Sequence, residues 1–217
     1  MTVDWSKLGP QGLDFFGSMS ASVSHEIKNV LAVVNENAGL LEDMLARAAQ
    51  GGEVDPERLS QLTRRIQSNI GRGDTIVKRM NRFAHSVDQL QSDVGVAELC
   101  DLMVAMSHRL ASQQQVRLAA QPGDYVTIHT WPYFLEHLFF LCLSFALEKA
   151  GKDSEVAVST GKDEQGAWIS INGVASPPDK SWLEAVDPLL QALQASVTHS
   201  YDTNSLIVRL PFKVQQV

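Results

Sequence analysis

Mostly apolar residues recur at alternating spacings of three and four along two long segments at the start of the chain. The first set is Leu13, Phe16, Ser20, Val23, Ile27, Val30, Val34, Asn37, Leu41, Met44 and Ala48, and the second is Leu59, Leu62, Ile66, Asn69, Gly73, Ile76, Met80, Phe83, Val87 and Leu90. A mean spacing of about 3.5 residues is typical of helices that pack in a left-handed supercoil. We therefore expect two helices of about 35 residues, each about 50 Å long and carrying one apolar seam.

The segment between the two seams carries signals that end one helix and begin the next. Gly51 and Gly52 stop the first helix, Asp55 supplies a cap and Pro56 suits the first position of the second helix. The chain should therefore turn back as an antiparallel hairpin. A lone hairpin of this length cannot cover its own seam, and pairing two hairpins into a four-helix bundle is the usual solution. We predict a homodimer.

The second half of the chain mixes helical and strand patterns. Helices are expected at 96–113, 131–150 and 182–196, and strands at 116–119, 125–129, 155–159, 167–171 and 205–211. Thr130 is predicted to cap the middle helix, with Pro132 in its first turn. The chain is thus predicted to be α+β, with a helical hairpin at 1–90, a short polar link and an α/β sandwich at 96–217.

Composition narrows the class of protein further. The chain has 217 residues, 44% hydrophobic and 20% charged, which is enough for two small cores. Its net charge of −7 argues against nucleic acid as the main partner. No apolar run reaches the length of a membrane span and no basic stretch precedes an apolar segment at the start, so a cytoplasmic protein is expected.

The most informative chemistry lies within the first seam, at Ser24-His25-Glu26-Ile27-Lys28-Asn29. Asn29 follows His25 by four residues and shares its helix face, while Glu26 flanks the imidazole. His25 offers a neutral ring nitrogen near pH 7. Glu26 is suited to hold the tautomer and to stabilise the charge that develops during attack on phosphorus, and Asn29 to orient water or a phosphoryl oxygen. The pattern reads as a phosphoryl-accepting site.

So short a pattern also occurs on ordinary solvated helix faces, and the seam around it is what favours the functional reading. His25 falls between the seam positions Val23 and Ile27, which points it outward, where a partner protein can reach it. The candidate docking residues lie on the same face toward the hairpin turn. They are Asn29, Ala32, Val33 and Glu36.

The motif, the Val30-Leu31 pair after it and the run from Arg72 to Ala84 resemble the dimerisation and histidine-phosphotransfer domain of two-component sensor histidine kinases. The resemblance extends over most of the chain. It implies that His25 is phosphorylated, that Glu26 assists and that Asn29 supports dephosphorylation of a response regulator. Val30 stands where many family members have Pro, which removes a kink but no chemistry.

The order of elements after residue 96 resembles the family's ATP-binding sandwich, but three expected features are missing. By register with the family, the two magnesium-handling Asn positions are Leu141 and Phe145, and neither side chain offers an oxygen ligand. The segment from Ile171 to Ala175 lacks the family's Asp and has one Gly. No Gly-rich lid appears between Ser176 and Asn204. The comparison implies that ATP does not bind.

We therefore expect a dimeric histidine phosphotransferase that receives a phosphoryl group from one receiver domain at His25 and passes it to another, with no cofactor of its own. Magnesium would come with the receiver. The alternatives are a response-regulator phosphatase, an active sensor kinase, or a non-catalytic scaffold that binds a regulator or kinase.

The remaining histidines and basic residues have simpler explanations. His85, His108, His129, His137 and His199 show no metal-ligand spacing, and Asn at position 29 removes the second ligand of a zincin-like helix, so no metal site is expected. Basic residues of the second helix are most simply a solvated face, part of which is suited to attract an acidic partner. They are Arg64, Arg65, Arg72, Lys78, Arg79 and Arg82.

Overall fold

The computed structural model describes residues 5–88 and 90–215 and contains helices and a mixed sheet, so the α+β class is confirmed. The chain forms two compact units. We call Met19–Arg82 the hairpin unit and the rest of the described chain the sandwich unit. Helix α1 (Trp5–Ala49) runs through both, so its first turns belong to the sandwich unit.

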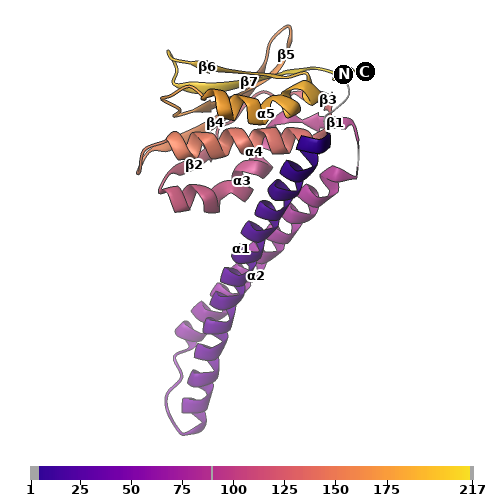
Figure 1. Cartoon of the computed structure of the whole chain (residues 1–217). Helices are drawn as coiled ribbons and strands as arrows, with labels where there is room; N and C mark the ends of the chain where they lie inside the picture. Colours follow the sequence, from indigo (N-terminus) through magenta and orange to yellow (C-terminus); the bar gives the residue numbers. More distant parts are fainter. Residues whose placement is uncertain (1–4, 89, 216–217) are drawn as a thin grey trace. The chain divides into compact units, whose positions relative to one another are not determined.

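Within the hairpin unit, α1 and α2 (Pro56–Ala84) lie side by side and antiparallel (Figure 1). The turn between them forms as the sequence predicts. Gly51 adopts a positive φ of 87°, and the Asp55 carboxylate accepts hydrogen bonds from the backbone N–H groups of Glu57 (2.9 Å) and Arg58 (3.3 Å). Pro56 takes the first helical position, where its missing N–H costs nothing. The predicted hairpin is confirmed.

The seam of the hairpin is also confirmed over most of its length. Val23, Val30 and Asn37 of α1 are buried, as are Leu62 and Ile76 of α2. The side-chain amide of Asn37 donates a hydrogen bond to the Val33 carbonyl oxygen at 2.6 Å, so its burial is compensated. A Cβ placed on Gly73 would lie 3.3 Å from Cγ1 of Val30, which brings these two positions level on the paired helices.

The predicted seam is wrong at both ends. Leu13 is 76% exposed, and the buried positions of the first turns are instead Leu8, Phe15 and Met19. The reason is tertiary, since the Phe15 ring packs against the rings of Phe83 and of three residues of the helix Pro132–Lys149, which are Tyr133, His137 and Phe140. At the other end α2 stops at Ala84, a short 3-10 helix η1 (His85–Val87) follows, and Val87 and Leu90 are exposed.

The sandwich unit holds a five-stranded sheet in the order β2-β4-β5-β7-β6 and a two-stranded sheet of β1 and β3. The strands are β1 (Ser92–Gly95), β2 (Arg117–Ala120), β3 (Thr127–Thr130), β4 (Glu155–Lys162), β5 (Gly166–Asn172), β6 (Ser196–Ser200) and β7 (Ser205–Pro211). The helices are α3 (Val96–Gln114), α4 (Pro132–Lys149) and α5 (Lys180–Leu193). Figure 1 shows the helices on one face of the larger sheet. β2 pairs in parallel with β4, and the other pairs are antiparallel.

The core of the sandwich unit lies between these helices and the sheet. Alternate residues of the central strands face the helices and are fully buried, including Val156, Ile169 and Val208. This alternation is the period-two pattern on which the strand predictions rested. The nearly uniform apolar character of α4 follows from its central place, because α3 and α5 pack against it on either side.

Three details of the sandwich differ from the prediction. Residues 92–95, expected to belong to a polar link, form strand β1, which pairs antiparallel with β3. Thr130 is the last residue of β3 rather than a helix cap, and Trp131 occupies the cap position without a side-chain hydrogen bond. The last helix ends at Leu193, and the residues after it form the edge strand β6, which was not predicted. A five-residue strand with alternating polar residues at a sheet edge leaves little signal in the sequence.

Candidate functional site

His25 lies on an exposed stretch of α1 within the hairpin unit. Asn29, one turn further, is also exposed and lies about 40° around the helix from His25, while the neighbouring Glu26 is half-buried. Among the side-chain hydrogen bonds between described residues, none uses His25, Glu26 or Asn29. The three side chains are therefore available to a reacting group from outside the chain.

The predicted docking residues continue this exposed face toward the turn. Ala32, Val33 and Glu36 are all exposed. Leu40 extends the row, and it is 38% exposed, as is Val33 seven residues before it. The sequence prediction did not include Leu40, although its seven-residue spacing from Val33 was the signal that marks a shared helix face.

A second exposed apolar row runs along the other flank of the hairpin. Leu31 and Leu45 of α1 are 60% and 59% exposed, and Ile70 and Val77 of α2 are 57% and 44% exposed. Each follows a seam residue directly, and in an antiparallel pair of right-handed helices such positions lie on the same side. Leu31 is about 120° around α1 from His25. The apolar row and the phosphoacceptor face are therefore separate surfaces.

The positions that correspond by register to nucleotide-handling residues lie on α4 in the sandwich unit. Leu141 is half-buried and Phe145 is buried. The Phe145 ring packs on Trp182 of α5 at a centroid distance of 5.1 Å, and the Lys149 ammonium lies 5.6 Å from the centre of the same ring. An aromatic pair therefore joins α4 to α5 at this point.

Only residues 173–179 connect β5 to α5, and the space from Ser176 to Asn204, where no lid was predicted, otherwise holds α5, β6 and a turn. Gly173 has a φ of 95°, and a Cβ there would lie 2.4 Å from the Glu155 carbonyl oxygen, so this position requires glycine. The Asn204 carbonyl oxygen accepts hydrogen bonds from the N–H groups of Gly173 and Val174 at 3.1 and 2.8 Å. Asp179 caps α5 by accepting from the Trp182 N–H at 2.8 Å. The connection is short, and hydrogen bonds hold both of its ends.

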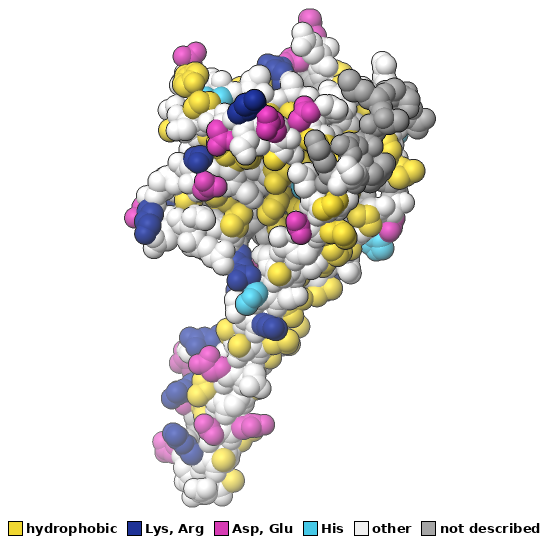
Figure 2. Space-filling view, viewed as in Figure 1, with side chains coloured by type: hydrophobic (Ala, Val, Ile, Leu, Met, Phe, Trp, Pro, Cys, Tyr) yellow, Lys and Arg dark blue, Asp and Glu magenta, His cyan; other side chains and the backbone are white. Residues whose placement is uncertain are grey.

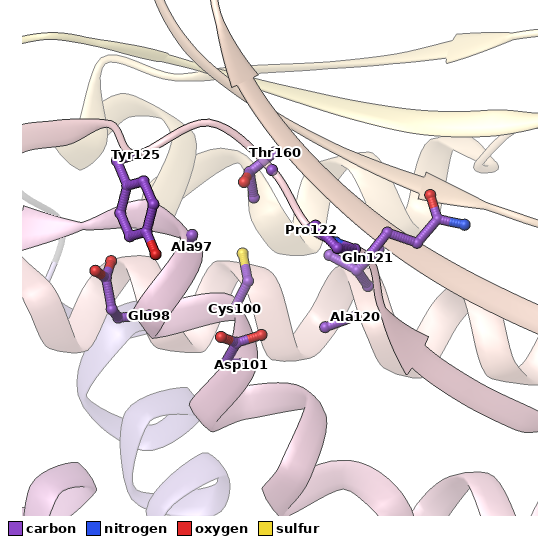
Figure 3. A pocket seen from close by; sticks show the side chains of 11 residues that line it. Ala97, Glu98, Cys100, Asp101, Ala120, Gln121, Pro122, Tyr125 and Thr160 are labelled. Atoms are coloured by element: carbon purple, nitrogen blue, oxygen red, sulfur yellow. The ribbon is translucent and has the colours of Figure 1, made fainter.

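A cavity of about 460 Å³ opens between the start of α3 and the end of β4, beneath the loop that joins β2 to β3 (Figure 3). Its polar lining includes the carboxylates of Glu98 and Asp101, the Thr160 hydroxyl and the Tyr125 ring. No lysine or arginine is among the lining residues. The two carboxylates would repel the phosphates of a nucleotide.

The other histidines have structural surroundings. His85 and His129 each bond a carboxylate, from Asp88 at 2.6 Å and Asp93 at 2.8 Å. His137 is buried in a stack on Phe15, and burial lowers its pKa to about 4. Within residues 5–88 and 90–215, no three His, Cys, Asp or Glu residues are grouped as metal ligands would be.

The helices give no sign of a membrane span. Across the part of the chain that the structure describes, none of them combines the length and the apolar character that crossing a bilayer requires.

The solved structures that this chain resembles are histidine kinases, in agreement with the resemblance seen in the sequence. Acinetobacter baumannii histidine kinase AdeS aligns with 81% of this chain and 95% of its own at 10% identity and a TM-score of 0.48. A histidine kinase from Burkholderia phymatum STM815 aligns with 92% of this chain and 98% of its own at 13% identity and a TM-score of 0.48.

Histidine kinase ThkA, solved in complex with the response regulator protein TrrA, aligns with 96% of this chain and 66% of its own at 14% identity and a TM-score of 0.48. No protein-family model and no curated protein matches the chain. A likeness at this level assigns no activity and no residue role.

Proposed function

We propose that this chain is a cytoplasmic, dimeric histidine phosphotransferase that carries a phosphoryl group between response-regulator receiver domains at His25. The observation that carries the proposal is the exposed His25 beside Glu26 and Asn29 in the middle of a long helix. The His25 side chain makes no hydrogen bond to the rest of the described chain. A phosphoryl carrier needs its nucleophile accessible to two successive partners, and this face meets that need.

In the proposed reaction, a lone pair of the neutral His25 ring attacks the phosphorus of an aspartyl phosphate. The N–P bond forms as the P–O bond to aspartate breaks, and the aspartate carboxylate leaves with the electron pair. Glu26 holds the proton on the other ring nitrogen and offsets the positive charge of the ring. The reverse sequence transfers the group to the aspartate of a second receiver, and the receiver's magnesium would neutralise charge on the phosphoryl oxygens.

Four features support transfer without ATP-dependent autokinase activity. Leu141 and Phe145 offer no oxygen to a magnesium ion. Phe145, one of the two positions assigned by register, packs on the Trp182 ring. The connection at residues 173–179 is too short for a lid. The acidic lining of the described cavity does not offer a substitute phosphate site.

The exposed apolar row supports the homodimer. Leu31 and Leu45 are spaced by fourteen residues and Ile70 and Val77 by seven, which is the periodicity of a helix-bundle interface. Burying four large apolar side chains in a second hairpin would contribute several kcal/mol of association free energy, at about 25 cal/mol per Å². A bundle formed on this flank leaves His25 uncovered.

The free Asn29 carboxamide favours a second candidate function, hydrolysis of the regulator's aspartyl phosphate. Asn29 is exposed on the His25 face and makes no hydrogen bond among the described residues, so it is available to orient a water molecule. In that case phosphate would leave the receiver without a lasting phosphohistidine.

The test is to incubate the full chain with candidate receivers that carry radiolabelled aspartyl phosphate, and to follow acid-labile, base-stable label on this chain. His25→Ala should abolish the label, whereas His85→Ala should retain it. His85 is a suitable control because it is also exposed and paired with a carboxylate, that of Asp88. Phosphate release without label favours the phosphatase. Receiver binding with neither label on this chain nor phosphate release favours a scaffold. Label on the His25→Ala variant refutes His25 as the phosphoryl acceptor.

A further inference from the structure

Four arginines of α2 recur every seven residues, at Arg58, Arg65, Arg72 and Arg79. We call this set the arginine stripe. All four are exposed. Residues seven apart share a helix face to within about 20°, so the stripe is continuous and about 32 Å long.

The stripe has no neutralising partner within the described chain. Among the ion pairs between described residues, none involves any of its four members. The neighbouring Lys78 is different, because it pairs with Asp74 at 2.7 Å on another face of α2. Like charges about 10 Å apart on one face do not stabilise one another, and Glu26, which borders the stripe from α1, forms no ion pair with it among the described residues.

Seam geometry places the stripe on the same side of the hairpin as the His25 face. Each stripe residue directly precedes a seam residue, as Arg65 precedes Ile66. Three residues of α1 also directly precede seam residues, and they are Glu26, Val33 and Leu40. In an antiparallel pair of helices, residues that directly precede the seam on the two helices lie on the same side of the pair. The apolar row of Leu31 and Ile70 lies on the opposite flank. In Figure 2, basic and acidic side chains alternate along one edge of the hairpin, and apolar side chains gather along part of the other.

Because Val30 and Gly73 lie level with each other, they also determine which residues of the two helices stand at the same height along the hairpin axis. Counting outward from it in the antiparallel pair puts Arg72 level with residue 31 and Arg79 level with residue 24. These two arginines therefore bracket His25 and Asn29 along the hairpin axis. The remaining two, Arg58 and Arg65, continue toward the turn beside Leu40 and the other docking candidates.

We infer that the arginine stripe is an electrostatic docking surface for the acidic, phosphate-bearing face of a receiver domain, an inference that rests on the proposed function. An aspartyl phosphate and the carboxylates that hold its magnesium give that face a negative charge. Arginine is suited to meet it, because its planar fork binds carboxylate and phosphate oxygens in pairs. Exposed Val33 and Leu40 beside the stripe supply the apolar contacts. The net charge of −7 favours a protein partner over nucleic acid.

The test compares charge reversal on the stripe with charge reversal beside it. Arg65→Glu and Arg72→Glu should each lower the kcat/KM of transfer from a phosphorylated receiver about tenfold at low salt, with kcat at saturation unchanged. Arg64→Glu is the matched control, because Arg64 is also exposed but lies about 100° around α2 from Arg65. Raising the salt to about 0.5 M should remove most of the difference, as expected for screened surface charges.

Receiver binding is measured in parallel by calorimetry, with dimer mass and thermal stability as folding controls. Equal affinity and rate in the Arg64 and Arg65 variants would overturn the stripe while leaving the phosphotransferase intact. If the wild type binds receivers but transfers no phosphoryl group, the proposed function is refuted. The role of the stripe in docking is then decided by the receiver affinities of the Arg64 and Arg65 variants. Absence of receiver binding in the wild type overturns both. Tighter binding to double-stranded RNA or DNA than to any receiver also overturns the stripe as a receiver surface.

Discussion

The Phe145 ring of α4 and the Trp182 indole of α5 lie 5.1 Å apart between centroids, at an interplanar angle of 45°. Aromatic pairs at this separation contribute roughly 0.5–1.5 kcal/mol beyond the area they bury. The pair helps to hold α5 on α4. The sequence register predicts that Phe145 stands at one of the two positions where the resembled family has a magnesium-handling Asn.

Nucleotide should therefore have no effect on this chain. Millimolar Mg-ATP is expected to leave the thermal midpoint unchanged and to give no phosphorylation of His25, because neither Leu141 nor Phe145 can coordinate the cation. Thermal denaturation with and without Mg-ATP, together with incubation with γ-labelled ATP, checks this. A receiver-transfer assay on the same preparation serves as the positive control, and label from ATP on His25 would contradict the proposal.

The roles within the motif should separate by mutation. Glu26→Gln keeps the shape of the side chain but removes its charge, so transfer should slow by about ten- to a hundredfold. Asn29→Ala should affect hydrolysis of the receiver's phosphate more than transfer, since its proposed task is to place water. Single-turnover measurements of both reactions distinguish the two variants. Equal loss of both activities in both variants, with receiver binding retained, would mean that the roles are divided wrongly.

Dimerisation should depend on the apolar row and not on the His25 face. Leu31→Glu or Ile70→Glu should yield monomers at micromolar concentration, with little loss of helicity because both side chains are already exposed. Leu40→Glu places the same charge on the opposite flank and should remain dimeric. Light scattering and circular dichroism supply the measurements. A monomeric wild type would refute the four-helix bundle.

His137 should make stability depend on pH. Burial lowers its pKa to about 4 from an ordinary value of 6.5, so the unfolded chain binds more protons between these pH values. The contribution of neutral His137 is fully present above pH 6.5 and is lost as the pH falls toward 4. The loss is on the order of 3 kcal/mol, at about 1.4 kcal/mol per pKa unit. Denaturant unfolding at pH 7 and pH 4.5 measures it.

His137→Phe provides the comparison, because it retains a ring to stack on Phe15, whose centroid lies 4.7 Å away. Carboxylates elsewhere titrate in both proteins, so the difference between them isolates the histidine. An identical dependence of unfolding free energy on pH in wild type and variant would show that His137 is not the group responsible.

The hairpin was predictable because its determinants are local. Asp55 and Pro56 specify the start of α2 through a side-chain cap and a fixed φ, and both act within a few residues. The outward direction of His25 followed in the same way, from its place between Val23 and Ile27. Its proposed chemistry rests on residue type and on resemblance, and stays a prediction.

Other features depended on residues that are distant in the sequence. Phe15 is buried because His137 and Tyr133 pack against it, and Tyr133 donates a hydrogen bond to the Gly12 carbonyl oxygen at 2.6 Å across a separation of 121 residues. The seam period alone placed Leu13 in the interior instead. Likewise, β6 forms because β7 supplies its backbone hydrogen-bond partners. The local sequence of β6 does not predict this pairing.

The sequence by itself determined the helical hairpin, the sandwich strands with strong alternation and the exposure of the His25 motif, because periodicity, caps and turns act over a few residues. The tertiary structure decided which face the first turns of α1 bury, where the last helix gives way to an edge strand and what lies beside Phe145. Each of these depends on contacts between distant residues, whose free energy outweighs the local preferences of the chain.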